Sequence, residues 1–152
     1  MLKANYVVGL VDGEGSFTVY VKSQSQERIR RVRVEPKFYL KLIEEDKAVL
    51  LELKKFFNCG NVYYQKDSRP NHKDCYRFEV TSRQDLIGKI MPFFKKNILR
   101  LESKQRDFRI FCQIMDKIMK NEHLTDDGLL KISKFKQNTL FSDEPFPTYK
   151  KG

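Results

Sequence analysis

The segment YVVGLVDGEGSF, residues 6–17, passes from a row of apolar residues into two carboxylates, Asp12 and Glu14, which alternate with glycines. A helix is predicted over residues 3–11, because the glycines that follow would break a longer helix. After the second of these glycines the hydrophobic period changes to two, which is typical of a half-buried strand. A helix that stops abruptly and turns into a strand is therefore the first predicted feature of the fold.

A second stretch, RVRVEPKFYLKL over residues 31–42, alternates more regularly. Four of its six odd positions are cationic. Its even positions are all apolar, namely Val32, Val34, Pro36, Phe38, Leu40 and Leu42. Since successive side chains of a strand point to opposite faces, one face of this strand is predicted to join the core and the other to carry a basic stripe.

The order of helix and two strands continues in the middle of the chain. Asp46 is placed to cap a helix over residues 47–57, and Gly60 is placed to close it. Strands are predicted at residues 61–66 and 75–81, separated by a polar loop. The side chains expected to face the core are Val62, Tyr64, Tyr76, Phe78 and Val80.

Helices are predicted after the strands. Ser82, with Asp85 three residues later, is typical of a capping box and would open a helix over residues 83–91. A longer helix near residues 103–119 carries apolar residues at helical spacing, and HLTDDGLLKISKF suggests a short final helix. Antiparallel hairpins with helices on one face make the predicted fold class α+β.

The length and net charge of the chain indicate the number of domains and the type of partner. The chain has 152 residues, a formal net charge of +10 and a pI of about 9.5. One domain over residues 1–141 and a loose tail at 142–152 are expected. The charge excess favours a polyanionic partner, nucleic acid first and an anionic membrane second. No run approaches the roughly 20 apolar residues that would span a bilayer, and no signal peptide is expected.

The cysteines and histidines argue against disulfide bonds and against a metal site built from these residues. Cys59, Cys75 and Cys112 are odd in number and far apart, which is more typical of small core residues in a reducing compartment than of disulfides or a zinc site. His72 and His123 are too few for a histidine-based metal cluster. The expected location is intracellular, in a bacterial cytoplasm or the interior of an organelle.

The acids of the opening segment have two interpretations. Aspartate and glycine are ordinary turn residues, so one interpretation is a helix end with solvated carboxylates. Carboxylates at a helix C-terminus face the negative end of the helix dipole, however, and a bound divalent cation would remove that conflict. Gly9 and Gly13 lie four residues apart on one helix face, which permits a second helix to approach. The pattern fits neither a phosphate-binding loop, nor a dinucleotide fingerprint, nor an EF-hand.

The segment VVGLVDGEG, residues 7–15, is followed in order by FFNCGNVY, PFFKKNILRLESKQRDF and NEHLTDDGLLKI. Together these blocks resemble the LAGLIDADG homing endonucleases, in the single-motif form that acts as a homodimer, over about residues 5–137. The resemblance implies an αββαββα fold, in which a curved antiparallel four-stranded sheet binds DNA and helices cover the other face. The hydrophobic pattern alone predicts the same order of elements.

In that family the motif helices of two subunits pack along their glycines, and the last acid of each motif ligates the divalent metals that cleave DNA. The resemblance implies Glu14 as the catalytic metal ligand, the Gly13 carbonyl as a second metal ligand, and Asp12 as the supporting acid of the site. Lys104 is the best match to a basic residue typical of the site. The implied dimer interface is Val8, Gly9, Asp12 and Gly13. The implied cofactor is Mg²⁺, or another divalent cation such as Mn²⁺.

The resemblance also implies that the outward side chains of the sheet contact double-stranded DNA in its major groove. Arginine and lysine suit guanine edges and phosphates, and glutamate can accept from cytosine. The implied DNA-binding residues are Thr18, Tyr20, Lys22, Arg31, Arg33, Glu35, Lys37, Tyr39, Lys41, Tyr63, Gln65, Arg77 and Glu79. Where many family members carry a polar residue late in the second strand, Leu42 stands here, or Lys41 if the register shifts by one residue.

The leading hypothesis is a metal-dependent, site-specific DNA endonuclease, encoded by a mobile intron, that acts as a homodimer on a long, near-palindromic target. Two alternatives on the same fold stay open. One is a maturase that binds intron RNA, and the other is a non-catalytic DNA-binding protein, which Leu42 would suit. Both motif acids are present, which favours the nuclease, because a pure binder has no need of them. No membrane partner is expected.

Overall fold

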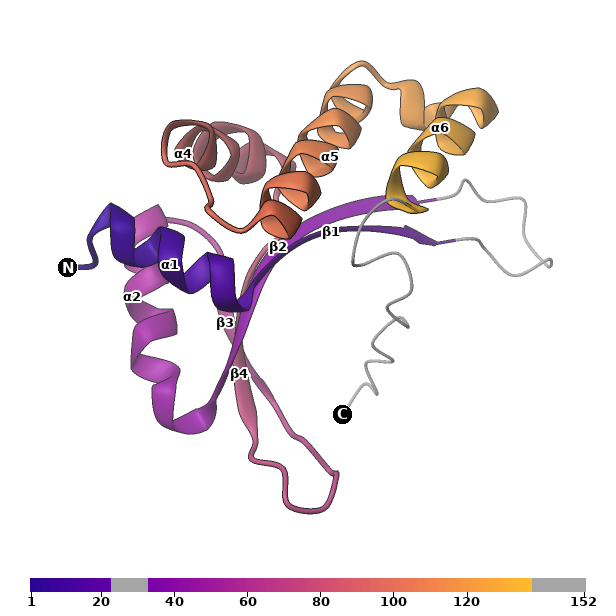
Figure 1. Cartoon of the computed structure of the whole chain (residues 1–152). Helices are drawn as coiled ribbons and strands as arrows, with labels where there is room; N and C mark the ends of the chain where they lie inside the picture. Colours follow the sequence, from indigo (N-terminus) through magenta and orange to yellow (C-terminus); the bar gives the residue numbers. More distant parts are fainter. Residues whose placement is uncertain (23–32, 138–152) are drawn as a thin grey trace.

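A four-stranded antiparallel sheet, in the strand order β1-β2-β4-β3, organises the computed structural model of the chain (Figure 1). The structure describes residues 1–22 and 33–137. The first half contains α1 (Ala4–Glu14), β1 (Gly15–Lys22), β2 (Arg33–Ile43), the short 3-10 helix η1 (Glu44–Asp46), α2 (Lys47–Phe57), β3 (Asn61–Gln65) and β4 (Cys75–Val80). The second half contains α3 (Arg83–Asp85), the π-helical η2 (Leu86–Ile90), α4 (Met91–Lys96), α5 (Glu102–Met119), the 3-10 helix η3 (Glu122–Leu124) and α6 (Asp126–Gln137). The predicted α+β class and the αββαββα order are confirmed.

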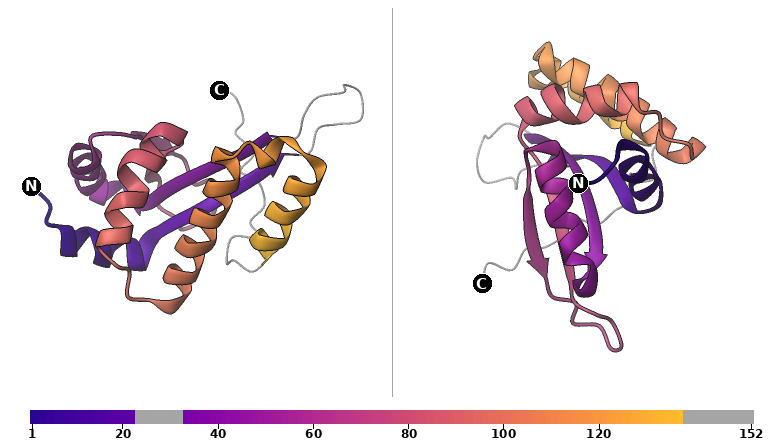
Figure 2. Two further views of the ribbon diagram at one scale, coloured as in Figure 1. Left: turned by 90° about the horizontal axis from the view of Figure 1, so that it is seen from above. Right: turned by 90° about the vertical axis from the view of Figure 1, so that its left-hand side faces the viewer.

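The sheet is curved, and the helices of the described chain lie on its convex side (Figure 1). Seen from above, α4 and α5 lie across the long pair formed by β1 and β2 (Figure 2). The concave side carries no helix within the described residues. The two faces therefore have different roles, because one closes the core and the other offers strand side chains to a partner.

Strand register brings the apolar residues of the sheet into rows. Phe38 of β2 lies opposite Phe17 of β1 on one side and opposite Val80 of β4 on the other. The predicted alternation in β2 is confirmed, because positions 34, 36, 38 and 40 are buried while positions 35, 37, 39 and 41 are half-buried. The core prediction for Tyr64 is wrong, because this residue, next to the last of β3, is exposed.

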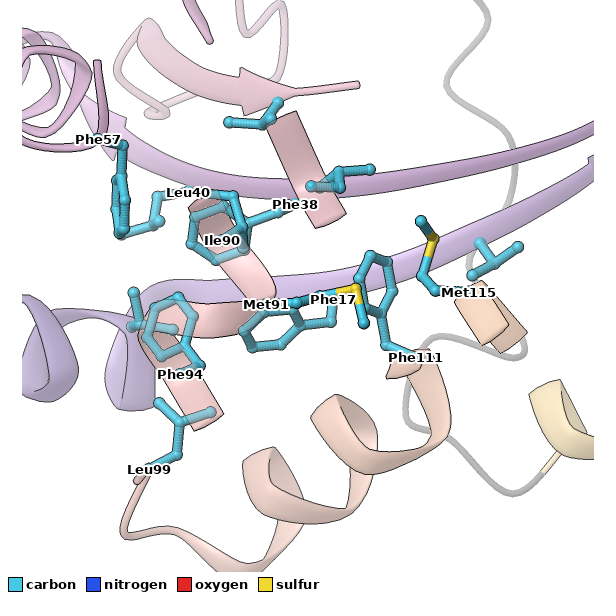
Figure 3. Packing of buried hydrophobic residues seen from close by; sticks show 14 of the residues in the cluster. Phe17, Phe38, Leu40, Phe57, Ile90, Met91, Phe94, Leu99, Phe111 and Met115 are labelled. Atoms are coloured by element: carbon cyan, nitrogen blue, oxygen red, sulfur yellow. The ribbon is translucent and has the colours of Figure 1, made fainter. Parts of the chain in front are cut away.

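Aromatic rings fill the space between the sheet and the helices (Figure 3). The ring of Phe17 lies 5.0 Å from Phe38, 5.4 Å from Phe94 and 5.6 Å from Phe111 between centroids. These rings come from β1, β2, α4 and α5, and offset or edge-on pairs of this kind add to the stabilisation from burial alone. The cluster ties the start of β1 to β2 and to the helices α4 and α5.

The first helix is longer than predicted. It continues through Gly13 and ends at Glu14, so the expected break at position 13 is wrong. A glycine inside a helix costs only about 1 kcal/mol, which the burial of Val7 and Val11 against the core offsets. The chain turns into β1 at Gly15, where an added Cβ would lie 2.6 Å from Cγ1 of Val11. Glu14 is consequently the last residue of the helix.

Other helix ends also differ from the sequence pattern. Helix α2 ends before Asn58, whose φ of 49° is left-handed, so Gly60 does not close it. Asp46 precedes α2 without accepting a capping hydrogen bond. Ser82 is confirmed as an N-cap, because its side chain accepts from the Asp85 N–H at 3.3 Å. The helix that opens there does not end at residue 91 but runs on through η2 and α4.

All three cysteines are free, and burial raises the pKa of Cys112 to about 11. No helix in residues 1–22 or 33–137 has the length and apolar character of a membrane span. The basic position Arg31, the apolar position Val32 and the tail 142–152 lie outside the described residues.

Candidate active site and nucleic-acid interface

Glu14 occupies the end of α1, at the point where the helix turns into the sheet. Its side chain is exposed, and within the described residues its carboxylate has no hydrogen-bond or ion-pair partner. The carbonyl of Gly13 belongs to the last turn, where helical carbonyls lack an intrahelical N–H. A free carboxylate and a helix-end carbonyl are hard oxygen donors, which are the ligands that Mg²⁺ and Mn²⁺ prefer.

Asp12 has a different environment from Glu14. It is buried, and its carboxylate accepts the Arg100 N–H at 3.1 Å and 3.0 Å and the Leu101 N–H at 3.2 Å. These bonds tie α1 to the segment that leads into α5, and both carboxylate oxygens take part in them. The second acid of the motif is thus engaged with backbone, whereas Glu14 remains open to a ligand.

We expect Asp12→Ala to lower the free energy of unfolding by about 2–4 kcal/mol, because the backbone N–H groups of Arg100 and Leu101 lose a buried, charged acceptor. Chemical denaturation monitored by circular dichroism measures the change. Glu102→Ala is the matched control, since Glu102 is an exposed acid in the first turn of α5, and a surface change of this kind is expected to stay within about 0.5 kcal/mol. Equal stability of the two variants would contradict the structural role of Asp12.

Lys104 reaches the same helix end from α5. Its Nζ donates a hydrogen bond to the carbonyl of Gly15, although the two residues are 89 positions apart in the chain. Gln105 donates to the Leu99 carbonyl at 2.6 Å and holds the loop before α5. The structure therefore places an ammonium group beside the residue that follows Glu14.

A groove of about 370 Å³ opens beside Glu14. Strand β2 contributes Lys41 and Leu42 to it. Leu42 packs against the hydrophobic core, while Lys41 belongs to the outer row of the sheet with Arg77. The basic residue, and not the leucine, is the polar group that β2 brings next to the carboxylate.

The far wall of this groove was not anticipated from the sequence. It is formed by the loop between β3 and β4, through Asp67, Arg69, His72 and Lys73. The sequence pattern of KDSRPNHKD, residues 66–74, predicts only a polar turn. The only feature of the sequence that could have pointed to this groove wall is the presence of three basic side chains within five residues, at positions 69, 72 and 73.

The groups present in one chain do not complete a metal site. No three His, Cys, Asp or Glu side chains converge on one point within the described part of the chain. Glu14 and the Gly13 carbonyl suit a divalent cation chemically, but a single chain supplies only one motif carboxylate, Glu14, that makes no hydrogen bond within the described residues. Further ligands would have to come from DNA, from water or from a second copy of the motif.

The expected DNA-contacting positions that the structure describes, which leave out Arg31, belong to the concave face of the sheet. Register places Thr18 opposite Lys37, Tyr20 opposite Glu35, Tyr39 opposite Glu79, and Lys41 and Tyr63 opposite Arg77. Gln65 lies on the same face, opposite Cys75. Arg33 begins β2 and is exposed, and Lys22 ends β1. Thr18, Tyr20 and Arg77 are buried, although the alternation predicted that their side chains face outward.

Charged groups on this face are paired with one another. The guanidinium of Arg77 stacks 3.5 Å from the ring centroid of Tyr39 and lies 2.9 Å from a carboxylate oxygen of Glu79. Lys37 lies 3.5 Å from Glu79 and 5.2 Å from the ring of Tyr20. Such contacts fix the direction of long side chains before a ligand arrives, which lowers the entropy lost on binding.

The glycine face of α1 is uncovered within the described residues. A Cβ built at Gly9 or Gly13 meets no heavy atom within 4 Å. A groove of about 500 Å³ runs beside this face, lined by Val8, Asp12 and Ile98 among others, and Ile98 is exposed. All four predicted interface positions thus lie along one side of α1, next to an exposed apolar residue.

Comparison with known proteins identifies relatives that share this sequence and architecture. The family model of the LAGLIDADG endonuclease matches residues 7–115. Over 131 residues the chain is 33% identical to the "Probable intron-encoded endonuclease 2" of Neurospora crassa, covering 86% of this chain and 28% of that protein. It is 32% identical to the homing endonuclease I-ApeII of Aeropyrum pernix, covering 75% of this chain and 63% of that protein. The chain therefore spans less than two thirds of these curated relatives.

Solved structures agree with the sequence comparisons. The homing endonuclease I-TnaI superposes with a TM-score of 0.77 at 37% identity, covering 91% of this chain and 88% of that one. The LAGLIDADG homing endonuclease I-SmaMI, bound to cleaved DNA, superposes with a TM-score of 0.79 at 30% identity, covering 91% of this chain and 44% of that one. The fold, the single motif and the family model lead to one conclusion. The chain belongs to the LAGLIDADG endonuclease family.

Proposed function

We propose that this chain is a site-specific double-strand DNA endonuclease that works as a homodimer on a long, near-palindromic target. The observation that carries the proposal is the contrast between the two motif acids. Asp12 is buried and accepts hydrogen bonds from two backbone N–H groups, whereas Glu14, at the end of the same helix, is exposed and has no hydrogen-bond or ion-pair partner within the described residues. An exposed carboxylate at this point would be available to a metal ligand sphere, since it makes no hydrogen bond or ion pair within the described residues.

Glu14 and the Gly13 carbonyl would hold a divalent cation, Mg²⁺ or Mn²⁺. Bound there, the cation would supply an activated water and neutralise charge on the phosphate. Lys104, held by the Gly15 carbonyl, and Lys41, on the outer row of β2, would attract and orient the phosphodiester by charge. Hydrolysis of the phosphodiester bond would follow from these groups acting together at the helix end.

The concave sheet would lie against the DNA duplex. Its long side chains are already aligned by mutual stacking and ion pairs, as at Arg77 and Tyr39, and a net charge of +10 per chain favours a phosphate-rich partner. Structures of I-SmaMI and I-LtrWI bound to DNA support this choice of partner. Two copies joined through the glycine face of α1 would bring two Glu14 carboxylates together, one for each DNA strand.

A randomised duplex library tests the proposal. We expect incubation with Mg²⁺ to release cut molecules that share one near-palindromic sequence, because two identical sheets would read two half-sites. Sequencing of the cut ends measures the target and the position of both nicks. Recovery of bound but uncut duplexes would favour the non-catalytic DNA-binding alternative, and selective capture of structured RNA would favour the maturase alternative.

A further inference from the structure

The loop between β3 and β4, residues 66–74, is folded around two of its own carboxylates, and we call it the arm. Asp67 accepts the backbone N–H of Arg69 at 3.1 Å and its Nε at 2.9 Å. These contacts with the Arg69 side chain and N–H hold the pKa of Asp67 well below its usual range. Asn71 takes a left-handed φ of 61° at the tip, which a turn of this kind requires.

The second carboxylate connects the arm to the body of the protein. Asp74 accepts the N–H of Asp67 at 2.9 Å and the hydroxyl of Tyr64, and its own carbonyl accepts the Glu44 N–H at 2.9 Å. The hydrogen bond to Asp74 raises the pKa of Tyr64 to about 12. Lys73 pairs with Glu45 of η1. The arm is therefore preformed and anchored beside the end of β2, although it projects from the sheet as a hairpin (Figure 1).

This folding separates the charges of the arm. Only 9% of the Asp67 side chain is exposed, against 64% for Arg69 and 61% for Lys73. His72 is also exposed, with its Nδ1 3.7 Å from Asp67. Asp67 is thus largely covered while Arg69, His72 and Lys73 are exposed, and these three basic side chains line the same groove as Glu14. A strand of DNA that presents a phosphate to Glu14 would pass along this groove.

We propose that the arm binds the DNA backbone beside the cleaved bond, with Arg69, His72 and Lys73 contacting phosphate and Asp67 acting as a positioning residue. The inference rests on the proposed function and deepens it, because it assigns the neighbouring phosphate to residues outside the family motif. Phosphate, and not a base edge, is the ligand, since Arg69 already directs its Nε and one terminal nitrogen at Asp67. The N–H groups that remain suit single charge-assisted bonds.

The variant Asp67→Asn distinguishes two roles of Asp67, namely holding the basic side chains of the arm in place and contributing a negative charge beside DNA. The change removes one negative charge beside DNA, so electrostatics alone predicts tighter binding and a cleavage rate no lower than that of the wild type. Loss of the arm's internal bonds predicts the opposite, a fall of about tenfold in DNA affinity and cleavage, the size of one charged contact. Glu52→Gln is the matched control, because Glu52 is an exposed acid on α2 that does not line the groove.

A scan of single uncharged methylphosphonates through the target duplex locates the contact. We expect wild type and Glu52→Gln to lose about tenfold in affinity when one phosphate beside the cleaved bond is replaced. Asp67→Asn and Arg69→Ala are expected to be insensitive at that phosphate alone and to keep wild-type sensitivity at all others. A disordered or unstable arm variant would lose sensitivity at many positions, which separates a local effect from misfolding.

DNA affinity is measured in Ca²⁺ and cleavage in Mg²⁺. The nuclease function and the phosphate contact of the arm are therefore tested by separate measurements, and either can fail alone. A chain that binds the selected duplex without cutting it overturns the proposed nuclease function, while the phosphate scan still tests the arm. If Asp67→Asn retains wild-type sensitivity at every phosphate, the arm makes no backbone contact and the inference is overturned. A chain that binds no duplex overturns both.

Discussion

Replacing Glu14 by glutamine is expected to lower the single-turnover cleavage rate by about three orders of magnitude or more while DNA affinity survives. Glutamine keeps the size of the side chain but removes the charge that would hold the divalent cation. Glu14 is exposed and makes no bond within the described residues, so the fold loses nothing. Binding would rest on the basic residues of the sheet, which the change leaves intact. Affinity and cleavage are measured on the same target duplex.

The control for this prediction is Glu52→Gln, which removes the same charge from an exposed site on α2. It is expected to cleave at the wild-type rate. Replacing Mg²⁺ by Ca²⁺ is expected to mimic Glu14→Gln, because Ca²⁺ coordinates loosely and activates water poorly. If Glu14→Gln cleaves near the wild-type rate, Glu14 is not a metal ligand needed for cleavage, and the nuclease proposal loses its main support.

Gly9→Leu is expected to convert a dimer into monomers and to reduce cleavage at least a hundredfold, since one chain supplies a single free motif carboxylate. Within one chain the change is harmless. An added Cβ at Gly9 meets nothing within 4 Å, and leucine is the better helix former. Any loss must therefore come from a second molecule that approaches this face. Sedimentation at micromolar concentration measures the state of association.

Gly88→Leu provides the matched control for the dimer prediction. Gly88 is also exposed and also has open space at its Cβ, but it lies in η2, away from α1. We expect this variant to sediment as the wild type does. A monomeric wild type, or a dimer that Gly9→Leu leaves intact, would contradict an interface along the glycine face.

Much of the fold could be predicted because hydrophobic period is a local property. Alternation in residues 31–42 correctly assigned the core face of β2 at positions 34 to 40, and the spacing near residues 103–119 correctly located α5. Helix ends were predicted less well. Asn58 ends α2 in place of Gly60, and Gly13 sits inside α1, because packing of the buried faces outweighs a propensity of about 1 kcal/mol.

The sequence by itself determined the element order, the two acids at a helix end and the basic face of one strand, because each of these features depends only on residues that are close together in the chain. Tertiary structure alone decided what surrounds those acids. Lys104 meets Gly15 across 89 positions, and Asp12 meets Arg100 across 88. The arm faces Glu14 only because β4 pairs with β2 and brings its loop beside the first helix. Periodicity tells which face of an element is buried, but convergence of distant side chains depends on how whole elements pack.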